Sequence, residues 1–311
     1  MSTRDRKSLP PELWNRVISN FNKEQDLPAL WTTLRHVNTT FRDIIESIFR
    51  TKHLRKTFIN FHLGEKWTDE IGRIVLNLEY NFSHLSNDQR IAIFETDVGD
   101  PEYTTEIRQR LKGIIADQER LLFIESPPFN VQIHRELNDT PIPGLSIDFE
   151  NFNLSCDWRG LFTRFFGEEQ IYHKYLTKWS ENNKAWATRM GDQAARGEID
   201  MMTVIQNALE SFAGASDESR KKARRARLNK QGKEQGKDWD WDVIGDENED
   251  KLVLKRIAEA RQLASMGEDS DFDEEEDEEG EEDEDGDEDD EDDEWEDASD
   301  NDETEDGESD S

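Results

Sequence analysis

Few residues in this 311-residue chain could do covalent chemistry. Cys156 is the single thiol, and the neighbouring carboxylate of Asp157 should raise the pKa of that thiol rather than activate it. No histidine pair has a metal-binding spacing such as His-Glu-x-x-His, and neither a Gly-Lys-Ser/Thr phosphate loop nor a Gly-x-Ser-x-Gly elbow is present. We therefore predict no catalytic residue, no metal site and no cofactor. The chain is interpreted as an interaction protein rather than an enzyme.

Charge is distributed very unevenly along the sequence. Of the 74 acidic residues, 32 lie in 267–311, which contains no Lys or Arg, while residues 1–266 have a net charge of −3. Like charges at this density repel one another, and the few apolar residues cannot bury enough surface to offset the ordering entropy. We predict a disordered acidic tail over 267–311, able to bind basic proteins such as histones or ribosomal proteins.

A basic cluster precedes the tail. Residues 220–237 hold nine Lys or Arg against one acid. Such a cluster suits a nuclear import signal or an exposed helix face, whereas specific nucleic-acid binding is not predicted because no aromatic stacking platform accompanies it. The import candidate consists of Lys221, Lys222, Arg224, Arg225 and Arg227. We predict a basic and polar linker over 215–249 and a short helix over 250–266.

Three short amphipathic helices are expected over residues 8–50. Apolar side chains recur there at spacings of three and four in three successive segments. Pro10 suits a helix start, and Asp26 and Asn38 can cap the second and third helices. Helices with apolar stripes that face one another form a small bundle.

The chain beyond residue 50 mixes strands and helices. Alternation of apolar and polar side chains predicts strands over 56–63 and 74–80. Further along, we expect a helix over 104–122 and an extended segment over 145–154. A helix with an aromatic face should begin at Trp158, and breaks are expected at Gly191 and Gly197. After them, a last helix of this unit should carry Met202, Ile205, Leu209 and Phe212. We predict that this mixed unit spans 51–214 and that compact structure ends near residue 214. The chain as a whole is then α+β and mostly helical.

The N-terminal residues carry a resemblance to a known family. Leu9-Pro10-Pro11-Glu12-Leu13 is similar to the opening Leu-Pro-x-Glu-Leu of the F-box, and Asp26-Leu27 with Leu30 is similar to its Asp-Leu-x-x-Leu step. Val37 and Phe41-Arg42 stand at its closing positions, although Asn38 replaces the Cys or Ser, and Phe41 the Trp, of many members. The remainder of the chain looks like uncharacterised fungal F-box proteins, without leucine-rich or propeller repeats.

This resemblance implies a non-catalytic, substrate-recognition subunit of a Skp/cullin-type (SCF) ubiquitin ligase. Residues 8–50 would dock a Skp-type adaptor and its cullin complex, and residues 51–214 would present a protein client for ubiquitination. The sequence does not name that client. The expected docking residues are Leu9, Pro10, Leu13, Val17, Ile18, Leu27, Leu30, Val37 and Phe41. Several of them must instead be internal core, because each helix is amphipathic and the bundle needs a core of its own.

A second class of function stays open. The chain could be a nuclear acidic-tail protein that chaperones histones or assists ribosome assembly, with the bundle used only for folding. The single cysteine, an N-terminus without a secretory pattern and the lack of an apolar run of about 20 residues indicate a protein of the cytoplasm and/or nucleus, without disulfide or membrane span.

Overall fold

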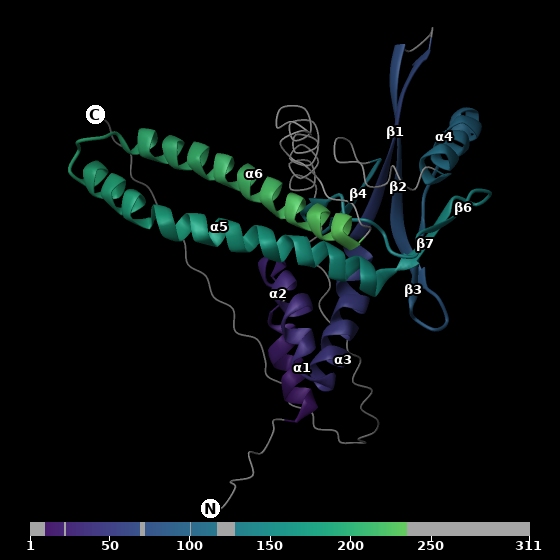
Figure 1. The fold of residues 1–311 in the computed structure, drawn as a ribbon, viewed down its shortest axis with the longest axis horizontal. Coiled ribbons are helices and arrows are strands. Elements are labelled where there is room, and N and C mark those ends of the chain that lie inside the picture. Colours follow the sequence, from purple (N-terminus) through teal and green to yellow (C-terminus); the bar gives the residue numbers. More distant parts are fainter. Residues whose placement is uncertain (1–9, 22, 69–71, 100, 117–127, 235–311) are drawn as a thin grey trace, which may run out of the picture. The chain divides into compact units, whose positions relative to one another are not determined.

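The computed structural model describes residues 10–21, 23–68, 72–99, 101–116 and 128–234. Within these residues the chain is α+β, with six α-helices and one seven-stranded antiparallel sheet, and helix is the commoner element (Figure 1). The predicted fold class is confirmed at this level. None of the described helices is long and apolar enough to span a membrane.

Three short helices open the described chain, as expected: α1 (Pro11–Ser19), α2 (Leu27–Thr32) and α3 (Thr39–Ile48). Asn38 caps α3, because its side-chain oxygen accepts a hydrogen bond from the backbone N–H of Phe41 at 2.8 Å. Asp26, the cap predicted for α2, makes no such bond. Pro28 lies in the first turn of α2, where its missing N–H costs no helical hydrogen bond.

The sheet has the strand order β5-β4-β1-β2-β3-β7-β6. The two predicted strands are confirmed as the long central pair, and the predicted extended segment supplies β6 and β7. The strands are β1 (Thr57–Thr68), β2 (Gly72–Leu85), β3 (Ile91–Glu95), β4 (Phe129–Ile133), β5 (Glu136–Asn138), β6 (Ser146–Asp148) and β7 (Asn153–Asp157). Strands β3, β4 and β5 were not predicted, since each is too short to show a clear alternation.

Helix α4 (Thr104–Ala116) confirms the helix predicted from residue 104 as far as the structure describes it. The guanidinium of Arg110 donates hydrogen bonds to the carbonyl of Leu63 at 2.8 Å and to the carbonyl of Glu65 at 3.1 Å. These bonds tie α4 to β1. They also satisfy two strand carbonyls near the bulge that interrupts the pairing of β1 with β2.

Two long helices follow the sheet, α5 (Trp158–Ala195) and α6 (Met201–Glu234). They run antiparallel, because Tyr172 bonds Ser216 while the later Trp179 contacts the earlier Phe212 (Figure 1). The break predicted at Gly197 is confirmed, and there the backbone has a φ of +71° that glycine adopts without strain.

Two predictions about these helices were wrong. Gly191 lies inside α5 and breaks nothing. Residues 215–234, predicted as linker beyond the compact structure, are the second half of α6, and every buried residue of α6 lies in this half. The rest of that linker, the short helix predicted over 250–266 and the acidic tail over 267–311 lie outside the described residues.

One hydrophobic core joins the N-terminal helices to the sheet and to α5. Trp31 of α2 lies at its centre, with ring centroids 4.8 Å from Phe49, 5.4 Å from Phe162 and 5.9 Å from Trp158. Its indole N–H donates a hydrogen bond to Oγ1 of Thr163 at 3.1 Å, so the ring is buried without an unsatisfied donor. The domain boundary predicted at residues 50 and 51 therefore does not separate two cores.

Candidate functional site

The predicted docking residues fall into two groups in the structure. Ile18, Leu27 and Leu30 are each 2% exposed and belong to the hydrophobic core. Their apolar character is accounted for by folding, because a side chain of this size gains about 1.5–3 kcal/mol on burial. These three residues are therefore excluded from a direct contact with a partner.

The other group is exposed. Leu13 is 45% exposed, Val17 42% and Val37 58%, and Pro10 is exposed as well. Phe21, which we did not predict as a docking residue, is 46% exposed. Leu13 and Val17 are four residues apart in α1, the spacing that places side chains along one side of a helix, and Phe21 follows two residues after α1 ends. We name Leu13, Val17, Phe21 and Val37 the N-terminal apolar face.

Two predicted docking residues need separate mention. Phe41 is half-buried, and its ring packs on Trp14 of α1 with centroids 4.9 Å apart. It thereby packs α3 against α1. Leu9 lies outside the described residues.

Helix α1 is weakly anchored for a helix that carries so many apolar groups. It has nine residues, and Ile18 is the single one that is buried. Isolated helices of this length are marginal in water, so their stability comes from packing an apolar face. A partner that covers Leu13 and Val17 would supply the packing that the described part of the chain does not. The arrangement suits a docking helix.

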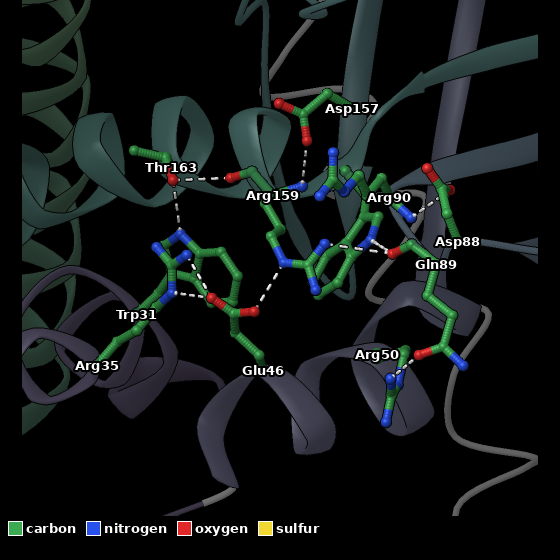
Figure 2. Close-up of polar contacts among 11 residues, drawn as sticks. Trp31, Arg35, Glu46, Arg50, Asp88, Gln89, Arg90, Asp157, Arg159 and Thr163 are labelled. Carbon is green, nitrogen blue, oxygen red and sulfur yellow. Dashed lines mark hydrogen bonds and ion pairs between the residues drawn. The ribbon is translucent and has the colours of Figure 1, made fainter. Parts of the chain in front are cut away.

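A second feature lies where the N-terminal helices meet the sheet and α5 (Figure 2). Glu46 of α3 accepts hydrogen bonds from Nε of Arg35 at 2.9 Å and from Nε of Arg159 at 2.7 Å. Burial alone would raise the pKa of Glu46, but the hydrogen bonds and charges of the two arginines lower it below its ordinary value. Glu46 is thus ionised at neutral pH and joins the two elements.

The turn between β2 and β3 is held at the same place. The carbonyl of Gln89 accepts hydrogen bonds from the indole N–H of Trp158 at 3.0 Å and from the guanidinium of Arg159 at 3.2 Å (Figure 2). Gln89 has a φ of +55°, a left-handed conformation that costs free energy in a residue other than glycine. The two donors fix this turn over the start of α5, where Asp157 caps the N–H of Arg159 at 3.1 Å.

A cavity of about 750 Å³ lies beside Glu46 and Arg159. Its lining is formed by Arg35, His36, Arg42, Glu46, Asp88, Arg90, Ile91, Asp157 and Arg159. Guanidinium groups donate paired hydrogen bonds to carboxylates, and the three acids of the lining can receive donors. Arg35 and Arg159 already bond Glu46, whereas Arg42 and Arg90 are exposed at the cavity, so these two guanidinium groups are the ones that suit a carboxylate of a peptide. The cavity contains no nucleophile paired with a base.

The import candidate is largely built into the fold. Arg224 is 3% exposed and bonds Asp139 at 2.8 Å, and Arg227 is 8% exposed and bonds both Asp139 and Glu168. Burial would raise the pKa of Asp139, but the two guanidinium charges lower it. A buried, paired arginine cannot be presented to an import receptor, so Arg224 and Arg227 do not belong to an exposed patch.

The remaining members of that cluster are more accessible. Lys222 is exposed and pairs with Glu218 one turn earlier, at 3.0 Å, while Lys221 and Arg225 are partly exposed. The spacing of the basic residues in the sequence did not indicate which of them are buried and which are exposed. Each buried pair joins residues at least 51 positions apart, so no local pattern could reveal it.

Three further side chains have metal-ligand types. Glu136 of β5 and Glu169 and His173 of α5 place one ligand atom each within 4.8 Å of one another. Glu169 and His173 are four residues apart on a helix, a spacing that a scan for His-Glu-x-x-His does not cover. However, the guanidinium of Arg220 bonds both carboxylates, at 2.6 Å for Glu136. The positive charge beside these two carboxylates therefore comes from Arg220. We interpret Glu136, Glu169 and His173 as part of the ion-pair cluster that α6 forms, and not as a metal site.

Two other titratable groups are buried. Cys156 is buried, and burial, with a smaller effect of Asp157, raises the pKa of its thiol to about 12, the direction expected from the sequence. Nδ1 of His53 lies 2.8 Å from Nε2 of His134. Burial, and then the charges of His134 and nearby lysines, lower the pKa of His53 to about 3. His53 is therefore neutral under ordinary conditions.

Comparison with known proteins gave no relative. No protein-family model matches the chain, no curated protein matches it, and no solved structure matches it. The functional argument therefore depends on the residues and their geometry.

Proposed function

We propose that this chain is the substrate-recognition subunit of a Skp/cullin-type ubiquitin ligase and docks the adaptor through the N-terminal apolar face. The observation that carries the proposal is the exposure of Leu13, Val17 and Val37, three predicted docking residues, of which Leu13 and Val37 stand at motif positions of the F-box resemblance. Exposed apolar groups on a marginal helix are typical of a surface that a partner covers.

The rest of the N-terminal segment supports the docking helix. Trp31 and its neighbours anchor α2 in the core, and Glu46 joins α3 to the start of α5. A bound adaptor would thus be held at a fixed position relative to the sheet and the long helices. In such an assembly other subunits perform the transfer chemistry, and this chain contributes proximity and orientation.

The cavity beside Glu46 is the proposed place for a client. It lies at the junction of the N-terminal helices with the sheet, and Arg42 and Arg90 are exposed at it. These side chains suit a peptide segment that contains carboxylates. A client held here would lie close to the docked adaptor.

Co-elution of the full chain with a purified Skp-type adaptor on size exclusion tests the proposal. We expect a stoichiometric complex with the native chain and none with Leu13→Asp/Val17→Asp. Removal of residues 1–50 is not a clean variant, because it takes Trp31 out of the core. Failure of the native chain to bind any Skp-type adaptor would contradict the proposal.

The acidic tail supports one alternative function. With 32 acidic and no basic residues, 267–311 could hold basic partners such as histones or ribosomal proteins. Deletion of 267–311 separates the two functions. The alternative predicts that the deletion abolishes binding to a histone, whereas adaptor docking should be unchanged.

A further inference from the structure

The α5–α6 pair carries an apolar surface that the proposed function does not use. Met202, Ile205, Leu209 and Phe212 are 46–68% exposed. At 3.6 residues per turn these four side chains lie within an arc of about 80° on α6. We name them the distal stripe. Large apolar side chains grouped in this way usually mark a surface that something covers.

The two halves of the long helices differ in what they contact. All buried residues of α5 lie between Trp158 and Tyr172, and all those of α6 lie from Ala215 onward. In the distal half, Phe212 contacts Trp179 of α5 with ring centroids 6.1 Å apart, which closes one edge of the distal stripe. Away from that edge the stripe is exposed among the described residues, with Met202 at 68% and Leu209 at 65%. A third helix laid along it would complete a three-helix arrangement.

The charges of the stripe indicate the partner that fits it. Residues 201–219 of α6 contain Glu210, Asp217 and Glu218 and no Lys or Arg. On the helix, Glu210 and Asp217 lie about 100–120° from the centre of the stripe, on the side away from α5. The matching surface is therefore an apolar helix face with basic residues beside it.

This chain contains one such segment. Over 250–266 the sequence predicts a helix in which Val253, Ile257, Ala260 and Ala264 recur at spacings of four and three. Residues 251–263 hold four Lys or Arg and one Glu. We propose that this segment docks in cis on the distal stripe and covers it.

The connecting chain is long enough for this contact. From Glu234, the last residue of α6, back to Leu209 is about 37 Å along the helix. The 19 residues from Glu234 to Val253 can span at most about 63–68 Å. Tethering would give the segment an effective concentration in the millimolar range, so even a weak contact would be largely formed.

Thiol labelling of a cysteine placed in the stripe tests this docking. Cys156 is buried, so in full-length Leu209→Cys the introduced thiol is the reporter. Its labelling rate is compared with the rates after adding Ile257→Asp or Ala258→Asp. Both place the same charge in the segment, but Ala258 is about 100° from Ile257 and outside the apolar face. Circular dichroism checks that all three chains fold alike.

We expect Leu209→Cys to be labelled about tenfold faster when Ile257→Asp is added and at an unchanged rate when Ala258→Asp is added. The tenfold factor corresponds to an effective concentration of about 1 mM and an intrinsic dissociation constant of about 0.1 mM for the contact. Added salt should also raise the rate in the parent chain. Equal rates in all three chains would overturn the proposal. Protection that disappears on dilution would also overturn it, because a second copy would then be the occupant.

Discussion

Helices α1 and α2 lie in the same N-terminal segment but differ in how far they are buried. Helix α2 has six residues and buries four of them, with Trp31 fully enclosed by aromatic rings. Helix α1 has nine residues and buries one. The difference shows that the apolar positions of this segment include some that the fold buries and some that it leaves exposed. Exposure in the fold separates them, whereas residue type does not.

The largest effect is expected at the anchor of α2. Trp31→Ala should lower the free energy of unfolding by about 3–5 kcal/mol, because it leaves a cavity among Phe49, Phe162 and Trp158. Urea unfolding followed by fluorescence would measure the loss. A change below about 1 kcal/mol would show that α2 is not part of the core.

Charged residues of α6 can also be compared as one buried and one exposed residue of the same helix. Arg224→Ala should cost about 3–5 kcal/mol, since it leaves the buried carboxylate of Asp139 with one guanidinium fewer. Lys222→Ala, its exposed neighbour two positions away, should cost no more than about 0.5 kcal/mol. Equal losses for both variants in urea unfolding would contradict the buried ion-pair cluster.

Protonation of His53 should make stability depend on pH. Its pKa is about 3 in the folded chain and near 6.5 when unfolded, so the unfolded chain binds the extra proton between these values. Stability is therefore fully present above pH 6.5 and decreases as the pH falls through that window, by about 2 kcal/mol between pH 6.5 and 5. Unfolding curves at several pH values would show it. A control with His53→Phe should reduce this slope, and an unchanged slope would show that His53 does not cause it.

The smallest effect on folding is expected in α1. Leu13→Ala should change the free energy of unfolding by no more than about 0.5 kcal/mol, because nearly half of the side chain is already exposed. Chemical denaturation beside Trp31→Ala would make the contrast quantitative. A loss above about 2 kcal/mol would mean that Leu13 is core and that α1 is packed as tightly as α2.

Local patterns predicted much of the fold. The three N-terminal helices, the paired strands β1 and β2 and the start of α5 were predicted because each carries its own periodicity. The Asn38 cap followed from local chemistry. The continuation of α6 was missed, because its stability comes from ion pairs with Glu136, Asp139, Glu168 and Glu169 that are distant in the sequence.

The candidate site was predicted less completely. The motif named residues of one segment, but it could not separate the buried Ile18 from the exposed Val17, which are adjacent in α1 and lie on different sides of the helix. Phe21 is exposed as well, but it lies beyond Ser19, where α1 ends, so the helical spacing of Leu13 and Val17 does not reach it. The cavity beside Glu46 combines residues from α3, the β2–β3 turn and α5, so no single stretch of sequence indicates it.

The most direct test of the account is a calorimetric titration of a Skp-type adaptor into the full chain and two α1 variants. Leu13→Asp puts a charge on the N-terminal apolar face, and Asn15→Asp puts the same charge on the other side of the helix, where Asn15 is exposed. We predict that Leu13→Asp weakens binding at least about 100-fold, a loss of about 2.7 kcal/mol, while Asn15→Asp stays within about threefold of the native chain. Equal binding by the two variants, or no binding by the native chain, would contradict the proposed docking face.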